Sequence, residues 1–249
     1  MRKPAGHNLT HAIVEQLGQA IVTGVYDSQN TFPIEADLCR QVSASRSVLR
    51  EAVKMLTAKG LLSARPRQGT IVEPEQHWNL LDPDVLRWLL ERKSSLSLLA
   101  EFTEVRLAIE PMAARLAARH VTAEAIARMH AAIERMKAAE HGEDDPLASD
   151  IAFHVAVLHA SGNRFYKQFE EFIGTALRIS IRLTNQFKGV AIANVSDHRK
   201  VLNAIEAGDG DKAHAAMDSI LREVVKLIDG ATKRARPAGS RRPPPGSPP

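Results

Sequence analysis

The chain has 249 residues, of which 44% are hydrophobic and only 4% aromatic, and it contains a single cysteine. Two domains can form at this length, and the aliphatic, alanine-rich apolar fraction favours helices packed on helices. No apolar run is long enough to cross a bilayer or to act as a signal peptide, and Cys39 cannot form an internal disulfide. We therefore expect a cytoplasmic protein.

The net charge of +4 is distributed unevenly. Residues 1–74 contain nine Lys and Arg against six Asp and Glu, residues 75–231 contain 19 against 23, and residues 232–249 contain five against none. Basic character therefore lies at the two ends of the chain. The last segment is rich in proline and lacks apolar periodicity, so we expect residues 232–249 to be a disordered tail.

Three helical patterns and a hairpin follow one another in the first 74 residues. Apolar residues recur at helical spacing over residues 11–26, and a second short helix begins after Pro33. A third helix is predicted from Ser45, its N-cap, to Gly60. The second and third helices form a helix-turn-helix, and the two short strands that follow form a wing.

The start of the third predicted helix carries a pair of arginines. Arg46 and Arg50 are four residues apart, so both can enter one major groove, where arginine binds guanine through two hydrogen bonds. The unpaired N–H groups of the helix start favour a phosphate. Such a pair alone is usually a solvated surface, but the preceding helix and the wing make it a candidate DNA contact. Arg65 and Arg67 in the wing are candidates for the minor groove or the backbone.

The rest of the chain has helical patterns only. After a linker over residues 75–83, which Pro74 precedes and Pro83 ends, helices are predicted for the segments 96–119, 122–140, 146–161, 164–188, 194–207 and 210–231. Runs of alternating apolar and polar residues are missing from this part. We therefore predict a mainly α protein with a winged helix-turn-helix domain over residues 8–74 and an antiparallel helical bundle over residues 84–231.

Candidate ionisable residues occur at three places in this bundle, in two pairs at helical spacing and one single histidine. Asp150 and His154 are four residues apart and can bind one metal ion, and the antiparallel bundle can bring His198 alongside them. Arg106 and Glu110 are also four apart on an inward face. Taken alone, each pair is more often a structural hydrogen-bonded or ionic pair than a site.

Several motifs in the first part resemble those of a known family. The stretches FPIEADL, SASRSVLREAVKML, KGLL and RQGTIV are similar to the winged-helix domain of the GntR family of bacterial transcription regulators. The resemblance implies that Arg46 and Arg50 contact bases or phosphates, that Ser45 and Ser47 contact phosphates, and that Gly69 forms the tip of the wing. Ala36 stands where many members have a basic residue, so this contact is absent.

The second part resembles the FCD effector domain of the FadR-type branch of that family. The matching stretches are FTEVRLAIEPMAARLAA, DIAFH, ASGN and DHRKVLNAIEAGDGDKAHAAM. The resemblance implies that Asp150, His154 and His198 bind a divalent metal, zinc or nickel, which binds a carboxylate effector. Ile220 stands where the family has the fourth ligand, a histidine. Arg106 with Asp150 and the histidines is the candidate effector site.

Together these observations predict a homodimeric repressor that binds operator DNA and is released by a sugar acid, as in regulators of galactonate catabolism. Another organic acid or an acyl-coenzyme A is the alternative effector. A metal-dependent enzyme is the remote alternative, because the three candidate ligands would leave room for water. No nucleophile motif, general base or phosphate-binding glycine loop accompanies them, so we expect no catalytic activity.

Overall fold

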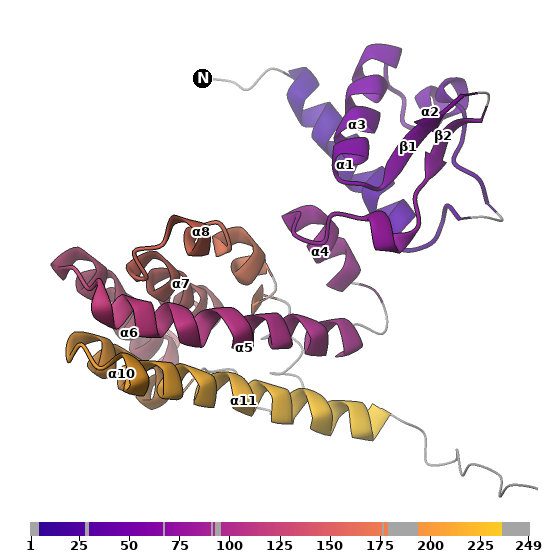
Figure 1. Ribbon diagram of the computed structural model, residues 1–249. Helices are drawn as coiled ribbons and strands as arrows, with labels where there is room; N and C mark the ends of the chain where they lie inside the picture. Colours follow the sequence, from indigo (N-terminus) through magenta and orange to yellow (C-terminus); the bar gives the residue numbers. More distant parts are fainter. Residues whose placement is uncertain are drawn as a thin grey trace, which may run out of the picture. The chain divides into compact units, whose positions relative to one another are not determined.

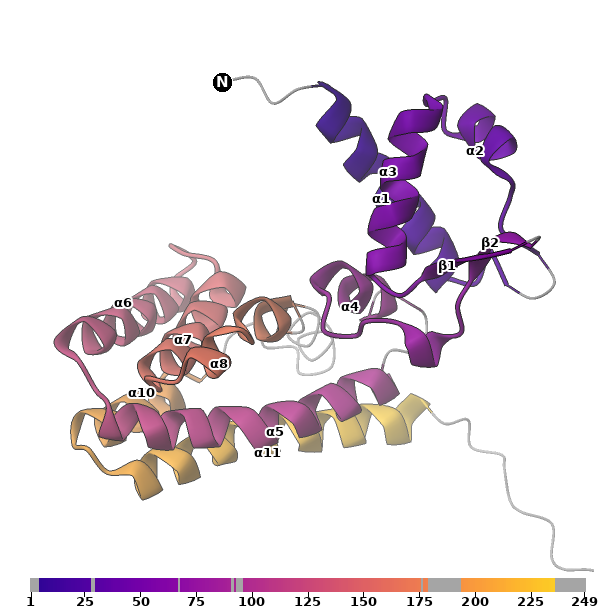
Figure 2. The same ribbon diagram turned by 45° about the horizontal axis from the view of Figure 1, so that its top comes forward.

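The computed structural model describes residues 5–27, 30–66, 68–90, 92, 96–175, 177–178 and 194–235. The chain divides into two compact units. The first consists of Met1–Ser95 and Gln168–Ile179, and the second consists of Leu96–Lys167 and Ser180–Pro249. Figures 1 and 2 show helices α1 to α4 with a small hairpin in the first unit, and a group of helices in the second.

The N-terminal unit begins with three helices, α1 (Ala5–Val22), α2 (Glu35–Gln41) and α3 (Arg46–Ala58). As predicted, Ser45 caps α3, since its side chain accepts a hydrogen bond from the backbone N–H of Val48. The apolar face of α3 packs against α1, as its spacing predicts. The buried side chains of these helices include Ile13, Val14, Leu17, Ile21, Leu38, Leu49, Ala52 and Leu56.

The wing is an antiparallel pair of strands, β1 (Leu62–Arg65) and β2 (Gly69–Val72), followed by a 3₁₀ helix, η1 (Glu75–His77). Arg65 pairs with Gly69 at the loop end of the hairpin. Gly69 has a φ of 78°, in the left-handed region that favours glycine after a three-residue hairpin loop. The motif RQGTIV therefore encodes the hairpin geometry, with its glycine at the start of β2.

Helix α4 (Pro83–Leu90) belongs to the same unit. Its Trp88 is buried against Gly18 of α1, and the indole N–H donates a hydrogen bond to Oε1 of Glu15, 3.0 Å away. Arg87 donates to both carboxylate oxygens of Glu15, at 2.8 and 2.6 Å. The sequence predicts that the effector domain begins at residue 84, but these contacts join α4 to the winged helix-turn-helix unit.

The second unit is helical throughout its described part. Its helices are α5 (Leu96–Arg119), α6 (Ala123–Glu140), α7 (Pro146–Ala160), α8 (Arg164–Lys167), α10 (Val195–Glu206) and α11 (Gly210–Ala235). A turn at residues 168–169 interrupts the helix predicted for 164–188, whose last part lies outside the described residues. Helix α11 runs through Ala235, so residues 232–235 are helical and not part of a tail. Residues 236–249 lie outside the described part.

Long helices build the core of the second unit. Helices α5 and α11 lie side by side, α6 packs on α7, and α10 contacts both α6 and α11 (Figures 1 and 2). Most of the buried side chains are aliphatic or alanine. The exceptions include a set of buried polar and charged residues on α5, α7 and α10, namely Thr103, Arg106, Glu110, Ser149, Asp150, His154 and His198.

These two units confirm the predicted fold class, a winged helix-turn-helix and an all-helical domain. The strands among the described residues are β1 and β2, which form one two-stranded sheet. No described helix combines the length and the apolar character needed to span a bilayer.

Candidate functional site

The first turns of α3 present the DNA-binding candidates to solvent. The side chains of Arg46 and Arg50 are 74% and 65% exposed. The hydroxyls of Ser45 and Ser47 lie 3.0 Å apart at the start of the helix, where the N–H groups of the first turn point outward. The structure thus brings together the four helical residues that the sequence singled out, on a surface of the kind that binds phosphates and base edges.

The wing adds one described cation to this set. The Arg65 side chain is 56% exposed, and its Nη2 is 3.8 Å from Oε1 of Glu73. Arg67, the second predicted wing contact, lies outside the described residues. Ala36 is exposed on α2, so this helix offers no cation at the position where many family members have one.

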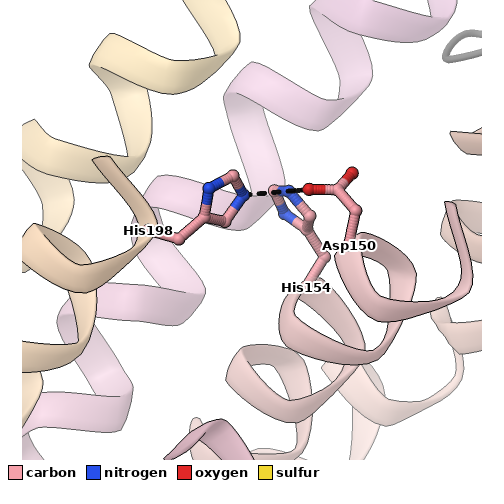
Figure 3. Close-up of side chains that lie close together, drawn as sticks. All are labelled: Asp150, His154 and His198. Atoms are coloured by element: carbon pink, nitrogen blue, oxygen red, sulfur yellow. Dashed lines mark ion pairs between the residues drawn. The ribbon is translucent and has the colours of Figure 1, made fainter. Parts of the chain in front are cut away.

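A second candidate site lies inside the helical unit. Asp150 and His154 on α7 and His198 on α10 each offer a ligand atom, and these atoms lie within 4.8 Å of one another. Figure 3 shows the carboxylate and the two imidazoles converging from the two helices. All three side chains are almost fully buried. The spacing of four residues on α7 and the packing of α10 bring together the three predicted metal ligands.

Hydrogen bonds fix the orientation of both imidazoles. Nδ1 of His198 is 2.9 Å from the backbone carbonyl of Asn194, which can only accept, so Nδ1 carries the proton. Nδ1 of His154 donates in the same way to the carboxylate of Glu110 on α5. Each neutral ring is therefore left with an unprotonated Nε2, the tautomer required of a metal ligand whose other nitrogen is hydrogen-bonded.

The Nε2 atoms of both imidazoles face the Asp150 carboxylate. Oδ1 of Asp150 is 3.0 Å from Nε2 of His198 and 3.8 Å from Nε2 of His154. Within the described part of the chain, neither Asp150 Oδ1 nor His198 Nε2 has a hydrogen-bond partner of good geometry. Buried polar atoms without partners are costly, and a cation between them would remove this cost. The donor set therefore fits a divalent metal.

The electrostatics of the cluster favour a cation as well. Burial alone would raise the pKa of Asp150, but the neighbouring histidines His198 and His154 lower it. Burial would likewise lower the pKa of His198, whereas Asp150 raises it. The cluster thus stabilises positive charge next to an ionised carboxylate, as a proton on His198 or as a metal ion in its place.

Arg106, the predicted effector contact, is almost fully buried and pairs with Glu110. Its Nε is 2.5 Å from Oε1 of Glu110, and its Nη2 is 3.4 Å from Oε2. Burial would raise the pKa of Glu110, but Arg106 and His154 lower it to about 2. Glu110 is therefore an ionised link between the guanidinium and His154.

Sequence reasoning missed two partners in this site. It found Glu110 only as a partner of Arg106, because no local signal relates α5 to the His154 position on α7. Asn194 carries a recognisable signal, since it is the N-cap of α10 and its carbonyl lies one turn before His198. Ile220 is half-buried on α11 and brings no ligand atom to the site.

Comparisons with known proteins cover both units. Residues 9–72 match the family of bacterial regulatory proteins, gntR family, and residues 101–223 match the FCD domain. The chain is 33% identical over 230 residues to the galactonate operon transcriptional repressor of Escherichia coli K12, covering 92% of this chain and 97% of the relative. It is 31% identical over 220 residues to the uncharacterized HTH-type transcriptional regulator YieP of the same bacterium, covering 88% and 94%.

A solved structure shows the same fold. Escherichia coli McbR/YncC aligns with a TM-score of 0.50 at 18% identity, covering 90% of this chain and 98% of the other. The domain matches and the relatives establish a DNA-binding transcriptional regulator with an effector domain, and not an enzyme. The chain belongs to the GntR family of bacterial regulatory proteins, in the branch that carries an FCD domain.

Proposed function

We propose that this regulator represses an operon for sugar-acid catabolism and is released from its operator when the acid binds in the helical domain. The observation that carries the proposal is the buried cluster of Asp150, His154 and His198 inside the part of the chain that matches the FCD domain. The 33% identity with a galactonate operon repressor supports a sugar acid as the effector class.

In this proposal the exposed surface of α3 reads the operator. Arg46 and Arg50 bind guanine edges or phosphates in the major groove, and the helix start binds a phosphate through its N–H groups and hydroxyls. The wing reaches the backbone or the minor groove. The proposed DNA contacts are Ser45, Arg46, Ser47, Arg50, Arg65, Arg67 and Gly69.

The buried cluster receives the effector. Asp150, His154 and His198 would hold a divalent cation, zinc or nickel, which when bound supplies positive charge for a carboxylate. Glu110 and the Asn194 carbonyl keep the two imidazoles in the ligand tautomer. Arg106 is the second cation available to the acid, and the hydroxyls of a sugar acid can exchange hydrogen bonds with such buried polar groups.

The proposed regulator acts as a cytoplasmic homodimer. A two-fold dimer places two winged helices on the two halves of a pseudo-palindromic operator, which doubles the contacts and sets the half-site spacing. The helical domains supply most of the dimer contact. Release requires that the acid bind the DNA-free arrangement more tightly than the DNA-bound one, because only a difference in affinity shifts the equilibrium.

The test uses the full-length protein and a fluorescent duplex covering the promoter beside its own gene. Anisotropy titrations at several salt concentrations measure binding, and galactonate, related sugar acids, dicarboxylates and acyl-coenzyme A are then added to the complex. We expect salt-sensitive binding that a sugar acid reverses. Release by a dicarboxylate or acyl thioester alone would overturn the effector class, and the absence of sequence-selective binding would overturn the repressor assignment.

Residue variants locate the DNA contact in the same assay. Arg46→Ala and Arg50→Ala should each weaken operator binding by about 1–3 kcal/mol, the value of a lost bidentate pair. Arg128→Ala is the matched control, because Arg128 is an exposed arginine of the helical unit that pairs with Glu124. Equal binding by all three variants would contradict the assignment of α3.

A further inference from the structure

We propose that Glu35 determines operator specificity by holding the two arginines of α3 in one orientation. Glu35 lies in the first turn of α2, and its carboxylate faces Arg46 and Arg50 on α3. The inference rests on the proposed assignment of these arginines to DNA, and it adds a residue of the other helix to the reading surface.

The geometry joins one carboxylate to two guanidinium groups through their Nε atoms. Nε of Arg50 donates a hydrogen bond to Oε2 of Glu35 over 2.9 Å. Nε of Arg46 is 3.9 Å from Oε1, the other oxygen of the same carboxylate. Among the described residues, Glu35 is the acidic side chain paired with either arginine. Each of its oxygens therefore serves one arginine.

Occupying Nε decides which edge of the guanidinium remains for DNA. An arginine can bind guanine O6 and N7 through its two terminal amino groups or through Nε and one amino group. When Nε donates to Glu35, the terminal pair is the edge that remains. Glu35 thus preselects the end-on fork for Arg50, attracts Arg46 only as an ion pair at 3.9 Å, and lowers the rotamer entropy that the two long side chains lose on binding.

The position of Glu35 is itself well anchored. The neighbouring Leu38 on α2 is buried, and α2 packs on α3, so the backbone that carries the carboxylate is held by the core. Arg50 also lowers the pKa of Glu35, which is therefore ionised at neutral pH. The negative charge of Glu35 repels DNA phosphates, so it weakens nonspecific binding in which the arginines contact only the phosphate backbone.

Exposure sets the scale of the effect. The arginine side chains are 74% and 65% exposed and Glu35 is 38% exposed, so the pairs add little to the stability of the free protein. Their role is expected in the bound state, where DNA removes water from the surface. Loss of Glu35 should consequently change the preference between DNA sequences more than it changes folding.

The experiment compares Glu35→Ala and Glu35→Gln with Asp37→Ala in the full-length protein. Asp37 lies on the same helix and pairs with Arg40, so its loss changes the net charge equally without touching the α3 arginines. Dissociation constants are measured for the promoter duplex and for a scrambled duplex of equal length over a salt series. The ratio of the two constants is the specificity.

We expect Glu35→Ala to bind the scrambled duplex more tightly and to lose about tenfold in specificity, which corresponds to roughly 1.4 kcal/mol. Glu35→Gln keeps one neutral acceptor, so it should lose less. Asp37→Ala should bind both duplexes slightly more tightly at unchanged specificity. If Glu35→Ala and Asp37→Ala show equal specificity, Glu35 contributes only its negative charge. If Glu35→Ala loses promoter binding and melting temperature together, Glu35 acts in folding. Either result overturns the proposal.

The arginine variants distinguish a failure of the Glu35 proposal from a failure of the proposed function. If Arg46→Ala and Arg50→Ala weaken promoter binding while Glu35→Ala keeps full specificity, only the role of Glu35 is wrong. If neither arginine variant affects promoter binding, the DNA assignment of α3 fails and the Glu35 proposal fails with it.

Discussion

Glu110 on α5 accepts a hydrogen bond from Nδ1 of His154 on α7, and both side chains are almost fully buried. The same carboxylate pairs with Arg106, so one acidic residue joins the buried guanidinium to the candidate metal ligands. The orientation of His154 therefore depends on a helix that contributes no metal ligand of its own.

Replacing Glu110 is expected to affect stability and metal affinity together. Glu110→Ala leaves Arg106 buried without its partner, which should cost about 3–5 kcal/mol in the free energy of unfolding. It also releases Nδ1 of His154, and losing such a partner of a metal ligand typically costs about 10–100-fold in affinity. Glu110→Gln keeps an acceptor for Nδ1, so its zinc affinity should fall less.

Urea denaturation and chelator competition for zinc measure the two effects separately. The variants are compared at the same folded fraction, checked by circular dichroism. Equal zinc affinity in the wild type and in a folded Glu110→Ala protein would show that Glu110 does not orient His154.

His154→Ala should separate effector response from DNA binding. The substitution removes one of the three candidate ligands from the interior of the helical unit and leaves the surface of α3 intact. We expect operator affinity within about twofold of the wild type and loss of release by the acid, measured by anisotropy. His130→Ala is the matched control, because His130 is an exposed histidine paired with Glu206. Normal release in His154→Ala would remove His154 from the effector site.

The N-terminal unit depends on the absence of a side chain at Gly18. A Cβ built at Gly18 would lie 2.2 Å from Cη2 of Trp88, whose ring is buried. Alanine normally stabilises a helix by about 1 kcal/mol relative to glycine, but overpacking a core costs about 1–3 kcal/mol. Gly18→Ala should therefore lower the stability of this unit, seen as a lower urea midpoint by tryptophan fluorescence.

A double-mutant cycle identifies the cause. If the collision with the indole is responsible, Gly18→Ala should cost less in a Trp88→Leu background than in the wild type. An equal cost in both backgrounds would trace the loss to α1 itself.

Acid should weaken the same unit through Glu15. Arg87 lowers the pKa of Glu15 below its ordinary value of 4.5, as does the hydrogen bond from Trp88, although burial opposes the shift. Because the folded-state pKa is lowered, the pairing stabilises the protein above about pH 4.5, and this contribution is lost as the pH falls through the folded-state pKa. Glu15→Gln should therefore show a shallower loss of stability on acidification.

Tryptophan fluorescence reports on the N-terminal unit, because both tryptophans of the chain, Trp78 and Trp88, belong to it. Urea midpoints are compared between neutral pH and about pH 3.5. Glu51→Gln is the control, since Glu51 is an exposed acid on α3 whose Lys54 partner is 3.5 Å away. If Glu15→Gln and the wild type lose stability equally on acidification, Glu15 is not the cause of the acid sensitivity.

The features predicted correctly from the sequence are those that local spacing determines. Ser45 caps α3 because a serine before an amphipathic run binds the N–H groups of the helix start. Asp150 and His154 share a face because they are four residues apart, and an antiparallel bundle brings His198 to them. The members of the cluster are therefore predictable from the sequence.

The relationships that could not be predicted connect different helices. Glu110 and His154 are 44 residues apart, and their contact depends on the rotation of α5 and α7 about their own axes. Glu35 and Arg50 meet only because the turn at Ser43, with a φ of 49°, sets the angle between α2 and α3. Likewise, α4 belongs to the first unit because the Trp88 ring packs against Gly18 of α1, and this contact between two helices has no local sequence signal.

Ile220 offers a gain-of-function prediction for the metal site. The FCD resemblance places a histidine at this position of α11, so Ile220→His should supply a fourth ligand to a site whose three candidate ligands are Asp150, His154 and His198. We expect zinc affinity to rise by at least about tenfold, or 1.4 kcal/mol, measured by chelator competition.

Val225→His provides the control for this gain, because residue 225 lies on a different face of the same helix, five residues further along. A new histidine there should leave zinc affinity unchanged. Adding His154→Ala to Ile220→His should abolish the gain, since the new ligand acts only through the shared ion. An unchanged affinity in Ile220→His would mean that position 220 does not reach the cluster.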